Sequence, residues 1–385
     1  MKRVVVMGIG MTKVDQHFEK GIEELFEEAV MKALEDAGNP RLDHVYLSNA
    51  YADLMCDQAD LGPILLDYAG MRSLPVTQVT GACGAGGCAF AEGFNAVASG
   101  SRDIVMVVGA EKVSDVVTKD ANAITSLCEN QGYEASQGLT LAGINAMAAR
   151  SYMQKYSATR EQLAMFAVQM HKNAVKNPYA SLPFEITTEK VIESFPVADP
   201  LTFLDSSPLN DGSAAVVMAS LDTARKFGDD LVEVSAVEQS VDNVSIHERD
   251  SLLTMRSTVE AAEKAYKQAK VNPTEINVCE IHDAFTITGF IALEDLSFVE
   301  RGKAGIAVED GTIAKDGKIP TNPSGGLKAR GNPVGATGVY QVAEVVLQLR
   351  GEAEGMQVEG SELGLTHNIS GFGSMATVGI LKRLK

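Results

Sequence analysis

Residues 80–88 read TGACGAGGC, a run of small side chains with a cysteine, Cys83, near its centre. The following residues are apolar and alanine-rich as far as Gly100, which is typical of a buried helix that stops at a glycine. Residues 103–109 then read DIVMVVG, which is apolar on both faces and predicts a central strand. A loop, a buried helix and a buried strand in this order indicate an α/β fold with a mostly parallel sheet.

The same alternation continues on both sides of this stretch and occurs twice. The first half adds strands at 3–9 and 44–50 around a helix at 22–34. The second half predicts these elements in chain order: a strand at 231–237, helix at 257–268, strand at 276–281, helices at 286–300 and 339–349, and strands at 362–366 and 375–381. Asn39-Pro40 and Asn272-Pro273 also occupy matching places. We infer an internal duplication, with two similar βαβαβ-type halves.

The middle of the chain interrupts this pattern. From residue 113 to residue 205 no strand of comparable strength is predicted, and helices are expected at 139–156 and 160–176 before a proline-rich loop. A strand at 214–219 returns to the core. We therefore divide the chain into three parts: residues 1–112 with 206–227, residues 113–205, and residues 228–385.

Composition excludes several classes of function. The chain has 385 residues, and 33 Lys and Arg against 51 Asp and Glu give a net charge of −18. This charge argues against binding to nucleic acid or to an anionic membrane surface. No apolar run approaches the ~18–20 residues of a membrane span, and no signal peptide is predicted. Five cysteines, an odd number, do not indicate a disulfide framework, so a reduced, cytoplasmic protein is expected.

Cys83 is the first candidate for chemistry. It lies between glycines at a loop-to-helix junction, where a helix N-terminus is expected to lower the pKa of a thiol and glycines admit a substrate. The alternative is a small buried cysteine. Cys88, inside the helix, and Cys56, Cys128 and Cys279, which lack a glycine setting, are interpreted as packing or incidental residues.

Two histidines follow apolar strands, where sites of α/β proteins are built. His282 occurs in IHDAF, and His367 precedes Asn368 in a third glycine-containing loop. Each could equally be a hydrogen-bonded structural histidine. The cysteines and histidines lack the spacing of metal ligands, and neither a phosphate loop nor a complete dinucleotide fingerprint is found.

Five motifs together resemble the thiolase superfamily, specifically archaeal thiolases and the sterol-carrier-protein type. They are CGAGG around Cys83, LNDGSAAVV at residues 209–217, HDAF at 282–285, GGLKARGNPVGATG at 325–338, and the HN-plus-glycine loop at 367–373. The resemblance covers essentially the whole chain. It implies two halves of mixed five-stranded sheet and helices in five layers (αβαβα), and residues 113–205 would be the loop domain that covers coenzyme A. It also implies a homodimer or homotetramer, and coenzyme A thioesters as substrates with no covalently bound cofactor.

Carried over residue by residue, the resemblance makes Cys83 the nucleophile that takes an acyl group. His282 holds the place of an Asn in the commonest thiolases, and Asn332 stands where the sterol-carrier type has the histidine that activates the cysteine. The second, α-proton-abstracting cysteine of the commonest thiolases is replaced by Asn368. The alternative cysteine of the HDCF box is replaced by Ala284.

The favoured hypothesis is therefore a thiolase-like acyltransferase with altered acid/base groups. His282 and Asn332 would hold the oxyanion of the second thioester. The backbone N–H of Cys83 and an N–H near Ser370 and Gly371 would hold the acyl oxyanion. His367 is the remaining candidate for proton transfer.

Two alternatives stay open. The protein could be an acyl-CoA-binding scaffold subunit that has lost condensation and is retained in a multi-enzyme complex. By resemblance, a small zinc/OB-fold protein and a hydroxymethylglutaryl-CoA synthase are possible partners. The set Cys83, His282 and Asn332 also resembles decarboxylative condensing enzymes, in which loss of CO₂ generates the carbanion.

Overall fold

The structure, a computed structural model, describes residues 2–384. Its strands are β1 (Val4–Met11), β2 (His44–Ser48), β3 (Val76–Val79), β4 (Ile104–Glu111), β5 (Pro196–Ala198), β6 (Leu201–Thr202), β7 (Gly212–Ser220), β8 (Val232–Val241), β9 (Val278–Glu280), β10 (Leu363–Ser370) and β11 (Met375–Arg383). Its α-helices are α1 (Ile22–Asp36), α2 (Ala52–Met55), α3 (Leu61–Tyr68), α4 (Ala85–Ser99), α5 (Thr118–Thr125), α6 (Leu141–Tyr156), α7 (Arg160–Ala174), α8 (Thr188–Ile192), α9 (Leu221–Ala224), α10 (Arg256–Ala269), α11 (Thr286–Asp295), α12 (Ala304–Glu309), α13 (Gly326–Ala329) and α14 (Thr337–Arg350).

The duplication inferred from the sequence is visible in the strand pairing. In the first half β2 is parallel to β4, and β4, β7 and β1 follow in antiparallel order. In the second half β9 is parallel to β10, and β10, β11 and β8 follow in the same antiparallel order. The strand equivalent to β3 is reduced to a single parallel bridge between Cys279 and Thr321. The second half therefore has four full strands, where the resemblance predicted five.

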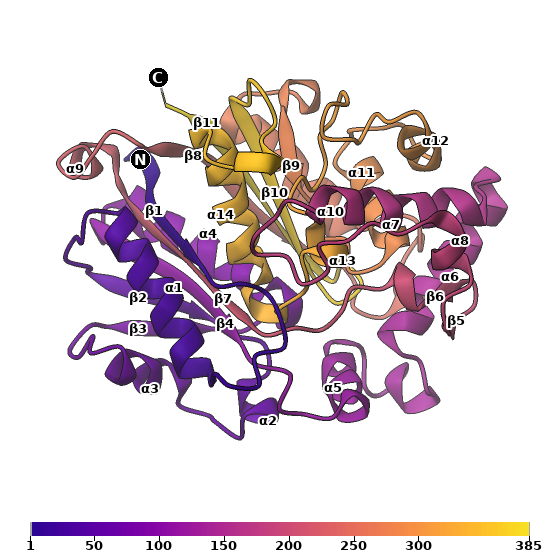
Figure 1. Cartoon of the computed structure of the whole chain (residues 1–385), viewed down its shortest axis with the longest axis horizontal. Coiled ribbons are helices and arrows are strands. Elements are labelled where there is room, and N and C mark those ends of the chain that lie inside the picture. The colour runs from indigo at the N-terminus through magenta and orange to yellow at the C-terminus, as the bar shows by residue number, and fades with distance from the viewer. Residues whose placement is uncertain (1, 385) are drawn as a thin grey trace.

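The two halves also join more closely than expected. Three residue pairs at the start of β1 and β8, among them Val4 with Val234, connect both sheets into one nine-stranded sheet. Away from this junction helices separate the halves. The helices α4 and α14 pack on each other between the strands of the two halves (Figure 1), while α1 covers β1 and β7 and α10 covers β8 and β11. The predicted five layers are thus present.

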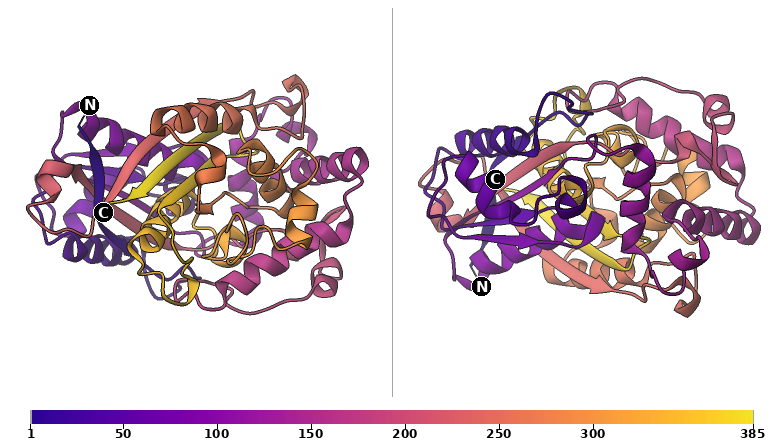
Figure 2. Two further views of the ribbon diagram at one scale, coloured as in Figure 1. Left: turned by 90° about the horizontal axis from the view of Figure 1, so that it is seen from above. Right: turned by 90° about the horizontal axis from the view of Figure 1, so that it is seen from below.

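The middle segment lies at one end of the molecule, against the second half (Figure 2). Its helices α6 and α7 contact α11, and α7 also contacts α12 and α13, so that they share one hydrophobic core with the C-terminal half. The strands β5 and β6 form a two-stranded sheet that the sequence pattern did not predict, because they are only three and two residues long. The boundaries 113–205 remain a prediction.

Other differences from the expected elements have local causes. The helix expected over 286–300 ends at Asp295, since Ser297 adopts a left-handed φ of +61°. The strand β3 was not predicted because its sequence, VTQV, has two exposed polar residues at the edge of the sheet. Among residues 2–384, no helix has the length and apolar character needed to cross a membrane.

Candidate active site

Cys83 lies in a single 3₁₀ turn, Ala82–Gly84, that leads directly into α4. The preceding residue, Ala82, has a φ of +49°, a left-handed conformation that is costly for a residue with a side chain and is often found at functional sites. The glycines after Cys83 are required for packing. A Cβ on Gly86 would lie 2.8 Å from the backbone nitrogen of Gly338, so glycine allows α4 and α14 to touch.

The electrostatic surroundings of Cys83 differ from those expected. Burial, together with the nearby carboxyl groups of Glu111 and Glu129, raises the pKa of its thiol to about 12. Hydrogen bonds from the backbone N–H groups of Cys83 and Gly371 lower this pKa only in part. The expectation that the helix N-terminus gives a low thiol pKa was therefore wrong, because loss of solvent outweighs the N–H groups. In the free protein at pH 7 this cysteine is a neutral thiol.

The same two N–H groups match the predicted acyl oxyanion site. Gly371 has a φ of +51° and follows Ser370, the last residue of β10, which pairs with Met375. The backbone N–H of Gly371 hydrogen-bonds the Cys83 sulfur. Of the two residues named from the sequence, Gly371 therefore supplies the N–H, and Ser370 anchors the turn by accepting the N–H of Gly373 at 2.9 Å.

His282 is buried beside the Cys83 turn, and Asn368 connects the two. The amide nitrogen of Asn368 donates to the carbonyl oxygen of Cys83 at 3.1 Å and lies 3.2 Å from Nδ1 of His282. The amide oxygen accepts the N–H of Gly87 at 3.0 Å, which fixes the orientation of the amide. Nδ1 of His282 must therefore accept a hydrogen bond, and the proton of the neutral ring is on Nε2.

Burial keeps this imidazole neutral. Burial, together with His367 and Arg330, lowers the pKa of His282 to about 3. A neutral ring with its proton on Nε2 is a hydrogen-bond donor for a developing oxyanion, as the sequence analysis proposed for His282.

Asn332 is brought to the same end of the molecule by the loop between α13 and α14. Its amide nitrogen donates to Oγ of Ser207 at 3.3 Å, and its amide oxygen accepts the hydroxyl of Thr337 at 2.8 Å. Two residues further on, Val334 packs in the same hydrophobic cluster as Cys83. The amide nitrogen carries a second hydrogen, which none of the bonds among the described residues uses.

A buried ion pair holds the loop that carries Asn332. Arg330 and Glu344 are 0% and 3% exposed, and Nε of the guanidinium lies 3.1 Å from the carboxylate. The guanidinium also stacks on Tyr340, 4.8 Å from the ring centre. Removing one partner of such a pair typically costs about 3–5 kcal/mol, so Arg330 anchors this loop on α14.

His367 does not reach Cys83. Successive residues of a strand point to opposite faces, and Asn368 takes the face toward Cys83. The ring of His367 lies on the other face, where Nε2 is 2.9 Å from Oγ1 of Thr258 on α10 and Nδ1 accepts the backbone N–H of His282 at 3.5 Å. Both ring nitrogens thus have structural partners, and the assignment of proton transfer to His367 is not supported.

Three side chains near Cys83 were not proposed from the sequence: Tyr51, Cys128 and Glu129. A Cβ on Gly371 would lie 3.0 Å from Oε1 of Glu129 and 3.5 Å from Sγ of Cys128. The thiol of Cys128 donates to Glu129 at 3.5 Å. Cys128 was interpreted as incidental, and the structure instead brings it to the site. No local pattern marks Cys128 and Glu129, since the path of the connection after β4 carries them there, whereas Tyr51 lies three residues after the end of β2.

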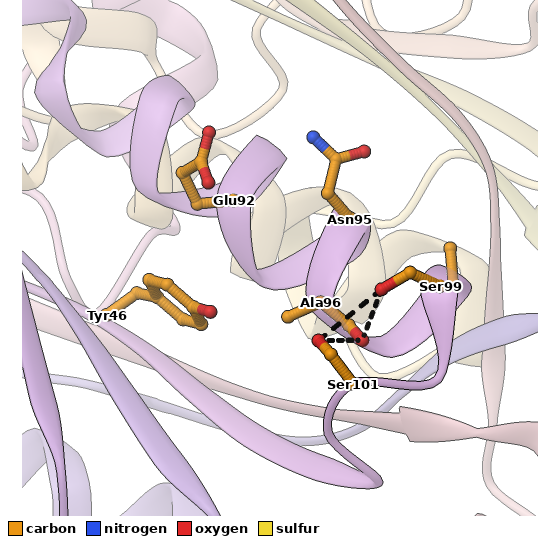
Figure 3. Close-up of a pocket in the computed structure, with 7 residues that line it drawn as sticks. Tyr46, Glu92, Asn95, Ala96, Ser99 and Ser101 are labelled. Carbon is orange, nitrogen blue, oxygen red and sulfur yellow. Dashed lines mark hydrogen bonds between the residues drawn. The ribbon is translucent and has the colours of Figure 1, made fainter.

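Figure 3 shows a shallow pocket elsewhere on the molecule, between Tyr46 of β2 and the C-terminal part of α4. Its residues include Glu92, Asn95 and Ser99. The Cys83 turn is at the opposite, N-terminal end of α4. This pocket is therefore separate from the site built around Cys83.

Comparison with known protein families shows which family this chain belongs to. The family description "Thiolase, N-terminal domain" matches residues 4–222, and "Thiolase C-terminal domain-like" matches residues 238–383. The chain belongs to the thiolase family. The resemblance seen in the five sequence motifs is thereby confirmed.

Individual proteins that are similar to this thiolase over its full length support the same family. An acetyl-CoA acetyltransferase of Methanothermobacter thermautotrophicus is 46% identical over 385 residues, which cover 100% of both chains. Sterol carrier protein 2 of Oryctolagus cuniculus is 32% identical over 401 residues, which cover 99% of the thiolase and 72% of that protein. A solved structure described as an Ltp2-ChsH2(DUF35) aldolase superimposes with a TM-score of 0.86 at 26% identity, over 99% of the thiolase and 98% of that chain.

Proposed function

We propose that this thiolase condenses two acyl-CoA thioesters, such as two molecules of acetyl-CoA, and cleaves the product by thiolysis. The acyl group is carried on Cys83. The observation that carries this proposal is that the thiol of Cys83, the N–H groups of Cys83 and Gly371, and His282, which Asn368 joins to the Cys83 carbonyl oxygen through Nδ1, meet at one turn. The relatives named acetyl-CoA acetyltransferase support the same reaction class.

In the first half-reaction the Cys83 sulfur attacks the thioester carbonyl carbon. The N–H groups of Cys83 and Gly371 stabilise the oxyanion, the bond from carbon to the coenzyme A sulfur breaks, and the thiol proton leaves with coenzyme A. Because the free thiol is neutral, proton loss must accompany attack. One well-placed oxyanion donor is typically worth about 10²–10³ in rate.

In the second half-reaction a second thioester loses an α-proton, and its carbon attacks the acyl group on Cys83. Its carbonyl oxygen becomes an enolate oxygen, which needs donors that are already in place. Nε2–H of His282 and the second N–H of the Asn332 amide supply them. The amide cannot act as a base near pH 7, so Asn332 cannot replace a histidine in activating Cys83.

Residues 113–205 are proposed to cover coenzyme A. Support comes from Val113 and Ala121, which open this segment and pack in the same cluster as Cys83. Hydrogen exchange with and without coenzyme A tests this part, and protection confined to residues 230–385 would contradict it. We further propose a homodimer or homotetramer in the cytoplasm. A small zinc/OB-fold partner and a hydroxymethylglutaryl-CoA synthase remain part of the proposal, and the second protein named in the aldolase neighbour, ChsH2(DUF35), supports a partner for this chain.

A steady-state comparison distinguishes the proposal from its alternatives. The protein is assayed for thiolysis of acetoacetyl-CoA by coenzyme A and for carbonate release from malonyl-CoA. The proposal expects thiolysis that depends on Cys83 and is lost in Cys83→Ala. Carbonate release without thiolysis would indicate a decarboxylative enzyme. Binding of acetyl-CoA with neither reaction would favour the scaffold subunit.

A further inference from the structure

The condensation proposed above needs a base for the α-proton, and neither familiar cysteine position supplies one. Asn368 is committed to His282 and Cys83, and residue 284 is alanine. Another side chain must therefore act as the base for the α-proton, on the side of Cys83 where the second thioester enters.

A titratable cluster lies directly against the turn at Gly371. This residue directs its N–H at the Cys83 sulfur, and a Cβ at the same residue would be 3.0 Å from Oε1 of Glu129. The Glu129 carboxylate also contributes to the electrostatic field at Cys83. One residue thus separates the nucleophile from a carboxylate that is only 5% exposed.

We propose that Glu129 is the general base that removes the α-proton of the second acyl-CoA, with Cys128 as the residue that positions it. The carboxylate takes the proton, and the C–H electron pair forms the new carbon–carbon bond to the acyl carbon on Cys83. The thioester bond to Cys83 then breaks, and the departing thiolate recovers the proton from Glu129. Atoms and charges balance with no further reactant. This inference rests on the proposed function.

The hydrogen bonds around Glu129 suit this role. Its carboxylate accepts the thiol of Cys128 and the backbone N–H of Phe372, which leaves further lone pairs for a substrate proton. Burial raises the pKa of Glu129, which strengthens it as a base while it remains ionised. Cys128 has one S–H, which is shared between the Glu129 carboxylate and the carbonyl oxygen of Thr125, 3.0 Å from Sγ, and this second contact holds Cys128 in place.

The other buried polar groups near Cys83 already have partners, including the hydroxyl of Tyr51, which donates to the carbonyl oxygen of Thr125 at 3.3 Å. Glu111 accepts the N–H groups of Ala50 and Gly335 at 2.8 and 2.9 Å, so it ties two loops together behind the nucleophile. His282 has its Nδ1 occupied and presents a donor at Nε2. His367 lies on the opposite face of β10.

Deuterium exchange separates this step from acylation. The whole protein and Glu129→Gln are each incubated with acetyl-CoA in deuterium oxide, and two quantities are measured: the acetyl adduct on Cys83, and deuterium in the methyl group of acetyl-CoA. We expect Glu129→Gln to form the adduct at no less than the original rate, because the Glu129 charge raises the pKa of Cys83. It should lose deuterium incorporation by about 10²–10⁴-fold, the usual contribution of a positioned base. Glu129→Asp, which keeps the carboxylate, should recover part of the exchange.

Glu294→Gln is the matched control, since Glu294 is 3% exposed and instead accepts the backbone N–H of Gly302 at 2.9 Å. It should exchange deuterium like the unchanged protein. If Glu129→Gln forms the adduct and still exchanges deuterium at the original rate, Glu129 is not the base, while the acyl-enzyme on Cys83 stands. Equal loss of adduct and exchange in Glu129→Gln would show a structural role and also overturn it. Absence of the adduct in the unchanged protein would instead refute the proposed function.

Discussion

The amide nitrogen of Asn368 lies 3.2 Å from Nδ1 of His282 and donates to the carbonyl oxygen of Cys83 at 3.1 Å. One side chain thereby fixes the proton of the histidine on Nε2 and ties it to the turn of the nucleophile. In the resemblance to the commonest thiolases this position belongs to a cysteine base. Here the residue has become a positioning group, which leaves proton abstraction to another side chain.

The near-isosteric change Asn368→Asp tests this arrangement. A carboxylate at residue 368 would accept a hydrogen bond from Nδ1–H of His282 and move the proton away from Nε2. Condensation should fall by about 10²–10³, the effect of losing one oxyanion donor, while acylation of Cys83 should fall less. Rates of the two half-reactions, measured separately, check this. Unchanged condensation would contradict the proposed role of the tautomer.

Asn332→His is expected to change the rate in the opposite direction. A histidine at residue 332 could accept the proton of Cys83, whose pKa burial raises to about 12. Turnover should rise by at least about tenfold, which is one order of magnitude below the ~10²–10⁴-fold that a positioned base typically contributes. Binding of coenzyme A should hardly change.

Steady-state kinetics and coenzyme A titrations of both proteins provide the measurement. Fast turnover with Asn332 that falls in the histidine variant would show that the site works best as a Cys, His and Asn centre. Equal, negligible turnover in both proteins would favour a scaffold role.

The buried His367 predicts a dependence of stability on pH. Burial lowers its pKa from 6.5 to about 3, so between these values the unfolded chain binds a proton that the folded chain does not. The free energy of unfolding should therefore fall as pH decreases, by up to about 1.4 kcal/mol per pH unit from this residue. Urea unfolding of His367→Gln at pH 6 and pH 4 should show a correspondingly shallower dependence. An identical dependence in both proteins would refute this.

The thiol of Cys83 should respond to pH in a characteristic way. With a pKa raised to about 12 by burial, its thiolate fraction grows about tenfold per pH unit below that value. The rate of alkylation by iodoacetamide, followed by peptide mapping, should therefore keep rising between pH 7 and pH 9. A plateau near pH 7 would indicate a thiol with a low pKa, as the helix N-terminus alone would give.

Much of the fold was predictable because its patterns are local. The apolar strands, the glycine stops and the repeated Asn-Pro in front of Val45 and Val278 gave the duplicated order of elements, and the pairing of β2 with β4 and of β9 with β10 confirms it. The edge strand β3 could not be predicted, since its exposed face has no apolar alternation to detect.

The site was predictable to the extent that it lies in glycine loops and at strand ends. Cys83, His282 and Asn332 were all named, and the structure brings them to one end of the molecule. Strand alternation predicts that only one of the neighbours His367 and Asn368 can face Cys83, and the structure shows that it is Asn368. Glu129 was not, because its place depends on the tertiary path of a segment without a regular pattern. Nor was the raised pKa of Cys83, which depends on burial by distant residues.

The most direct measurement is intact-protein mass spectrometry after incubation with acetyl-CoA, followed by peptide mapping. We predict one acetyl group on the peptide that contains Cys83, absent from Cys83→Ala and removed when free coenzyme A is added. A protein that binds acetyl-CoA but forms no adduct, or that carries the acetyl group on Cys88 or Cys128 instead, would contradict an acyl-enzyme on Cys83.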